Sequence, residues 1–246
     1  MSNSFRISIG LSLLMLFAKP CLGASIESLF HEGVSAYGAA DYERAADAFG
    51  RAAAIQPASG TLQNLGNAEW QQGQTGPAIV AWEQALWLDP FNQSARNNLR
   101  FARKVAQLES PDLAWYEVVS TWLPANWWAW IAGLSLWLAV AMTLLPSIFR
   151  RRKTAWQQAV AAMALMVFLL SLPAHAGVYT RSHIGFIVEK DTPLRLTPTA
   201  DSQNLTRLAA GTPARWERLR GRFLLIQTPE GLRGWVEKSC LSAMGD

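Results

Sequence analysis

The chain has 246 residues, half of them hydrophobic, with 22 basic and 18 acidic side chains and two cysteines. Four of the basic side chains form one tetrad between two apolar runs, so we assign the excess positive charge to membrane orientation and expect no nucleic-acid partner. Two cysteines exclude a disulfide framework, and the lengths left on either side of the apolar runs exclude a large enzyme.

Residues 1–24 have the layout of a secretory signal peptide. Arg6 precedes an apolar core over residues 7–18, and the small-residue end Cys21-Leu22-Gly23-Ala24 follows. This pattern predicts export of the chain, with cleavage after Gly23 or Ala24.

Residues 25–108 contain an internal repeat with an offset of 33 positions. Glycine, alanine, aromatic and proline positions recur in the same order, as Gly33 and Gly66, Ala45 and Ala78, Phe49 and Trp82, Ala52 and Ala85, and Pro57 and Pro90. Small residues let two antiparallel helices approach closely, and the closing proline ends each second helix. The pattern resembles the tetratricopeptide repeat, whose usual length is about 34 residues. The resemblance implies an all-α solenoid of two repeats.

An amphipathic stretch over residues 92–108 follows the repeats and predicts a capping helix. In the tetratricopeptide family the first helices line a concave groove. The resemblance implies that the lining residues here are Gln63, Asn67, Trp70, Asn97 and Phe101. Two interpretations stay open: the groove binds an extended or helical peptide, or the array is a dry spacer.

Residues 109–126 predict a short interfacial helix. Ser110 and Pro111 are a typical helix start. An apolar stripe follows at helical spacing, formed by Trp115, Val118, Val119 and Trp122. We expect this helix to lie at a membrane surface, and the alternative is an extension of the capping helix.

Two charge-free runs, residues 127–149 and 154–177, are each long enough to cross a bilayer. Because unpaired backbone groups are costly in lipid, the runs predict a helical hairpin, the alternative being two buried core helices. Tryptophans crowd the outer end of the first run, as they do at headgroup level. An Ala-x-Ala motif that ends at Ala176 leaves open a second cleavage, which would release the C-terminal part.

The loop between the runs, residues 150–153, consists of Arg150, Arg151, Arg152 and Lys153. Lys and Arg are retained on the cytoplasmic side of membranes. The tetrad therefore predicts a two-pass protein of the bacterial cytoplasmic membrane, with both soluble parts on the periplasmic or exterior side.

Residues 178–246 change to short alternating runs with turns, which predict five strands in a small all-β barrel. The region resembles a bacterial SH3 (SH3b) domain through Leu194-Arg195, Ala210-Gly211-Thr212 and Gly234-Trp235-Val236. Domains of that family bind peptides or cell-wall fragments. Trp216 is a candidate contact residue, and a core role is equally consistent with the sequence.

No catalytic or metal-binding pattern accompanies these segments. His31, His175 and His183 have no Cys or carboxylate at ligand spacing, and no phosphate loop or nucleophile motif occurs. We therefore expect no enzyme activity, no cofactor and no metal.

The order of signal peptide, repeats, hairpin and SH3b-like region resembles the BatE-like proteins of the Bacteroides aerotolerance group. The resemblance implies a multi-domain membrane scaffold whose soluble parts recruit proteins, including partners with von Willebrand factor A domains and a MoxR-type ATPase system. Two alternatives remain. The β region could bind peptidoglycan as a wall sensor, or the repeats could simply hold the chain in a larger complex.

Overall fold

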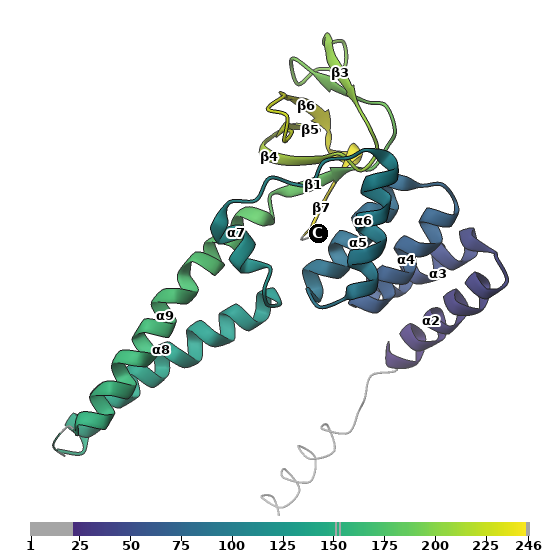
Figure 1. Cartoon of the computed structure of the whole chain (residues 1–246). Coiled ribbons are helices and arrows are strands. Elements are labelled where there is room, and N and C mark those ends of the chain that lie inside the picture. Colours follow the sequence, from purple (N-terminus) through teal and green to yellow (C-terminus); the bar gives the residue numbers. More distant parts are fainter. Residues whose placement is uncertain (1–21, 151, 153, 245–246) are drawn as a thin grey trace, which may run out of the picture.

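The computed structural model describes residues 22–150, 152 and 154–244 (Figure 1). The signal peptide expected over residues 1–24 lies outside the described residues except for its last three, which begin the first helix. Eight helices and one seven-stranded antiparallel sheet make up the described part. An N-terminal helical array, an apolar hairpin and a C-terminal β region are thereby confirmed at this coarse level.

The N-terminal array consists of two antiparallel helix pairs and a fifth helix. In chain order these are α2 (Leu22–Gly38), α3 (Tyr42–Ile55), α4 (Ser59–Gln71), α5 (Thr75–Leu88) and α6 (Gln93–Ala106). Each pair is closed by the same contact: a Cβ added at Gly33 would lie 2.6 Å from the ring of Phe49, and one at Gly66 would lie 2.7 Å from the ring of Trp82. The 33-residue sequence repeat is therefore also a structural repeat.

The seven strands form one sheet in the order β3-β2-β6-β5-β4-β1-β7. They are β1 (Ile184–Ile187), β2 (Thr192–Arg195), β3 (Asn204–Leu208), β4 (Pro213–Arg220), β5 (Phe223–Gln227), β6 (Arg233–Glu237) and β7 (Leu241–Ala243), with a 3₁₀ turn over Lys238–Cys240. The expected count of five strands is too low, because β3 is largely exposed and has few apolar residues, and β7 has only three residues. Ile187, Leu194, Ile226 and Val236 form the core of the sheet.

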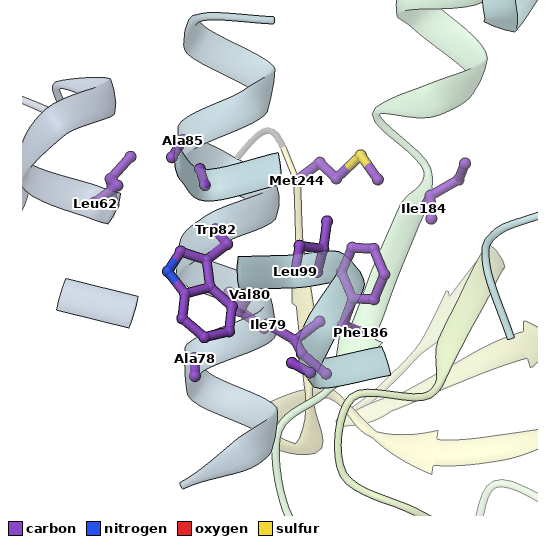
Figure 2. Packing of buried hydrophobic residues seen from close by; sticks show 12 residues of the cluster. Leu62, Ala78, Ile79, Val80, Trp82, Ala85, Leu99, Ile184, Phe186 and Met244 are labelled. Atoms are coloured by element: carbon purple, nitrogen blue, oxygen red, sulfur yellow. The ribbon is translucent and has the colours of Figure 1, made fainter. Parts of the chain in front are cut away.

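One hydrophobic cluster spans the helical array and the sheet. Ile79 and Leu99 pack in the same buried cluster as Ile184, Phe186 and Met244, the C-terminal strands lying against α5 and α6 (Figure 2). At the edge of this contact a Cβ on Gly76 would lie only 2.1 Å from the carbonyl oxygen of Val188. The two parts therefore form one packed body, although the sequence presents them as separate modules.

The apolar hairpin consists of α8 (Ala125–Ile148) and α9 (Ala155–Arg181), so α9 extends four residues beyond the end expected at Gly177. Both helices are long and apolar enough to span a membrane, and only 11% and 17% of their apolar windows are buried. Small residues, among them Ser135, Ala139 and Ala164, are the buried ones. Small residues let two membrane helices approach closely. Burial this low contradicts the alternative of two buried core helices.

The segment before the hairpin is less helical than expected. α6 ends at Ala106, where Gln107 adopts a left-handed conformation with φ of 54°, so the segment does not extend the capping helix. α7 (Trp115–Ser120) begins five residues after Ser110. Residues 108–114 before it have no regular secondary structure, and Leu113 packs against the cluster that the array shares with the sheet.

α7 buries its polar face and exposes its apolar face. Glu117 and Ser120 are 1% exposed, whereas Trp115, Val118 and Trp122 are exposed. The expected apolar stripe is therefore present and points away from the protein. α7 packs against α9, where a Cβ on Gly177 would lie 2.2 Å from the carbonyl oxygen of Tyr116.

Glu117 is buried because β4 supplies a matching cation. Arg215 donates to both carboxylate oxygens of Glu117, at 2.8 and 3.0 Å, and to the carbonyl oxygen of Thr180 on α9 at 3.0 Å. The backbone N–H of Ala114 donates to the same carboxylate. Burial would raise the pKa of Glu117, but these hydrogen bonds outweigh it and the pKa lies below its ordinary value. One ion pair thus joins α7, α9 and the sheet.

Replacing Glu117 by Ala leaves Arg215 half-buried without its anion. We expect the full chain in detergent to lose about 3 kcal/mol of stability, the lower end of the range for breaking a buried pair, because Arg215 keeps some hydration. Thermal unfolding measures the loss. The control is Glu217→Ala, which breaks an exposed pair with Arg233 in the same sheet and should cost less than about 1 kcal/mol. Equal losses in the two variants would contradict the assignment.

Because of Glu69 on α4, we expect the free energy of unfolding to depend on pH. Burial raises its pKa to about 7, and its Oε2 atom has no hydrogen-bond partner among the described residues. Because the folded state holds the proton more tightly than the unfolded state, Glu69 makes stability fall as pH rises from about 4.5 to about 7, by at most about 3 kcal/mol. Glu69→Gln should remove this decline, seen as a smaller difference between melting temperatures at pH 5 and pH 8. An unchanged difference would contradict the burial of an unpaired carboxylate.

Candidate partner-binding groove

The helical array carries a hollow of about 290 Å³ between α4, α5 and α6, which reaches the end of α2. Aromatic and amide side chains dominate its walls, which consist of Tyr37, Asn67, Trp70, Gln71, Trp82, Asn98 and Phe101. We call this hollow the groove. Aromatic anchors beside a few fixed polar groups are typical of peptide-binding surfaces.

The polar part of the groove is a fixed amide network. The Oδ1 atom of Asn67 accepts hydrogen bonds from the Trp82 indole N–H at 3.1 Å and from the Asn98 amide at 2.7 Å. The same indole N–H also lies 3.2 Å from the carbonyl oxygen of Gln63. This network sets the orientation of the Asn67 amide, whose nitrogen has no acceptor among the described residues. The groove therefore presents an amide donor to a ligand.

The apolar part of the groove is built on Trp70. Its ring lies 5.9 Å from the ring of Trp82, which is buried, and 6.0 Å from the ring of Phe101 in an edge-to-face arrangement. Phe101 is 58% exposed. Because its far face meets solvent, a ligand side chain can cover it without displacing a protein contact.

The structure brings together three of the five groove residues that the sequence suggested, namely Asn67, Trp70 and Phe101. Gln63 contributes only its carbonyl oxygen, and Asn97 is exposed outside the lining. Asn98 takes the place expected for Asn97, because consecutive residues on a helix point about 100° apart. Trp82 also belongs to the groove, although its sequence position indicated only core packing.

The other expected site residues lie elsewhere. Arg150 and Arg152 are exposed at the turn of the hairpin, whereas Arg151 and Lys153 fall outside the described residues. Trp216 is half-buried at the joint between α9 and the sheet, with its ring 4.4 Å from that of His183. Its backbone N–H donates to the carbonyl oxygen of His183 at 2.9 Å.

Other chemistry is sparse in the part of the chain that the structure describes. No group of three His, Cys, Asp or Glu side chains there could hold a metal ion. Cys240 is buried, and burial raises the pKa of its thiol, so little thiolate forms near neutral pH.

A scan of protein-family models gives no match to this chain. A search of curated proteins likewise gives no significant match.

Two substitutions at Asn67 separate the loss of its side-chain acceptor from the loss of its side-chain donor. Asn67→Ala removes the acceptor of two hydrogen bonds, and we expect it to cost about 1 to 2 kcal/mol in thermal unfolding. Asn67→Asp keeps that acceptor and loses only the outward donor, so its unfolding temperature should stay closer to that of the parent chain. If Asn67→Asp destabilises as much as Asn67→Ala, the amide network is not as described.

Proposed function

We propose that the protein is a membrane-anchored scaffold that recruits protein partners through the groove, on the exterior side of the bacterial cytoplasmic membrane. The observation that carries this proposal is the groove itself, whose lining includes the exposed ring of Phe101 and the Asn67 amide, the nitrogen of which has no acceptor among the described residues. The packing of the array onto the sheet, and of the sheet onto α7 and α9, holds the groove at a set position relative to the hairpin.

Membrane anchoring accounts for the apolar surface of the hairpin. Exposed side chains on α8 and α9 include Leu134, Trp137, Met163 and Leu170, each at least 64% exposed. In water such a surface would be a strong aggregation site, whereas hydrocarbon is its natural solvent.

The proposed sidedness rests on two independent sequence signals. The cationic tetrad at the hairpin turn favours a cytoplasmic turn, and the N-terminal signal peptide favours export of the array. Both signals favour an exterior array, and the cytoplasmic turn favours the same side for the sheet.

The groove would select a ligand that has both an apolar side chain and a hydrogen-bond acceptor. An apolar side chain would cover Phe101 and Trp70. A peptide carbonyl would accept a hydrogen bond from the side-chain N–H of Asn67. An extended or helical peptide segment of a protein partner offers both groups.

The order of segments supports a BatE-like assignment within the Bacteroides aerotolerance group. Under that assignment the partners are membrane proteins with von Willebrand factor A domains, working with a MoxR-type ATPase system. We favour protein scaffolding over peptidoglycan binding because Trp216, the candidate contact residue of the β region, is half-buried against His183, while Phe101 is 58% exposed.

A photo-crosslinking amino acid at exposed Gln71, which lines the groove, tests the proposal in intact cells. We expect discrete crosslinks to exterior or membrane proteins. Phe101→Ala should lower their yield about tenfold, since losing one apolar anchor costs more than about 1.4 kcal/mol. Mass spectrometry identifies the products.

The matched control is Val105→Ala on the same helix, because Val105 is as exposed as Phe101 and lies outside the groove. Equal yields from the two variants would refute recognition by the groove. Crosslinks to cytoplasmic proteins alone would refute the sidedness.

A further inference from the structure

A second hollow, of about 650 Å³, lies where the helical array meets the outer end of the hairpin. Helices α5 and α6 form one wall, and the segment around α7 together with the end of α9 forms the other. We call it the cleft. Its charged lining consists of Glu83, Arg96, Arg100, Arg103 and Arg181.

The cleft carries an excess of positive charge. Four arginines line it against one glutamate, and that glutamate is already paired, since Arg103 donates to Glu83 with both side chains largely buried. Arg96 donates to the carbonyl oxygen of Pro90, which carries no net charge. Arg96, Arg100 and Arg181 therefore face the cleft without a salt bridge among the described residues, although the charges of Glu83 and Glu117 also act on Arg181.

Some of these guanidinium groups also have unsatisfied donors. The Nε atoms of Arg103 and Arg181 are buried and have no hydrogen-bond partner among the described residues. Arg181 is held in place by Ser120, to which it donates at 3.2 Å, and by the ring of Trp87, 5.0 Å beneath its guanidinium carbon. The side chain of Arg100 is exposed and forms no hydrogen bond or ion pair within the described part. A bound anion with several acceptor oxygens would satisfy such an arrangement.

The position of the cleft indicates the source of the anion. α8 begins at Ala125 and α9 ends at Arg181, so the cleft adjoins the end of the hairpin where both helices leave the apolar region. Trp122 lines the cleft, and Trp127 and Trp130 are exposed just beyond it. Tryptophan concentrates at the headgroup level of bilayers.

We propose that the cleft binds the phosphodiester headgroup of an anionic phospholipid from the leaflet in which this end of the hairpin lies. The arginines contact the phosphate, and the apolar wall formed by Leu86, Trp122 and Met244 contacts the glycerol and the start of the acyl chains. Arginine is suited to this role because its planar fork donates two parallel hydrogen bonds to phosphate oxygens. The inference rests on the membrane anchoring in the proposed function and is independent of the groove.

Native mass spectrometry of the full chain, released from nanodiscs, tests the assignment. Phosphatidylglycerol should bind at least tenfold more tightly than phosphatidylcholine of the same acyl chains. Arg100→Gln should weaken phosphatidylglycerol binding at least about tenfold, as expected for the loss of one charge-assisted hydrogen bond. Because Arg100 is exposed and unpaired, this variant should fold normally.

Lys104→Gln is the matched control, since it removes the same charge from an exposed position on α6 outside the cleft. Equal weakening by both substitutions would overturn the proposal in favour of diffuse charge attraction. If inorganic phosphate binds saturably and abolishes the preference for phosphatidylglycerol, the bound anion is free phosphate and not a lipid headgroup, and the proposal is overturned. Failure of the protein to float with vesicles would refute membrane anchoring itself, whereas loss of the lipid preference in a protein that does float would refute only the cleft.

Discussion

The burial of one carboxylate determines how the parts of this chain are arranged. Glu117 is 1% exposed, and a carboxylate at such a depth needs a cation that meets both of its oxygens. Arg215 supplies that cation from β4 and also reaches the backbone of α9 at Thr180. With this pair in place, α7 must turn its polar face inward and its apolar face outward. The exposed apolar side chains of α7 then lie on a helix that packs against the end of α9.

Helix α6 serves both proposed binding sites. Asn98 and Phe101 point to the groove, while Arg96, Arg100 and Arg103 line the cleft. One face of α6 is highly charged and another carries an aromatic side chain. The amphipathic pattern alone did not predict these two roles, because a capping helix is expected only to close the array. In the proposed scaffold, one helix therefore contacts a partner and a lipid headgroup at the same time.

The features that sequence predicts here depend on local contacts. Gly33 meets Phe49 sixteen positions later, and Gly66 meets Trp82 at the same separation, so the repeat reveals the helix pairs. The length of the two apolar runs likewise indicates the hairpin. Long-range contacts left no such signal in the sequence. Glu117 and Arg215 are 98 positions apart, and the whole hairpin lies between Gly76 and Val188 along the chain. The expectation that the α7 stripe faces a membrane came from its place beside the apolar run, because periodicity identifies a face and not its direction.

The central claim is that the helical array and the sheet form one rigid body at the end of the hairpin. Spin labels at exposed Arg51 on α3 and exposed Arg207 on β3 test it most directly, in a chain with Cys21 and Cys240 replaced and reconstituted in nanodiscs. Pulsed electron paramagnetic resonance measures the distribution of distances between the two labels. The account predicts a single narrow distribution. A broad or multiple distribution would contradict it, because the array and the sheet would then be moving independently.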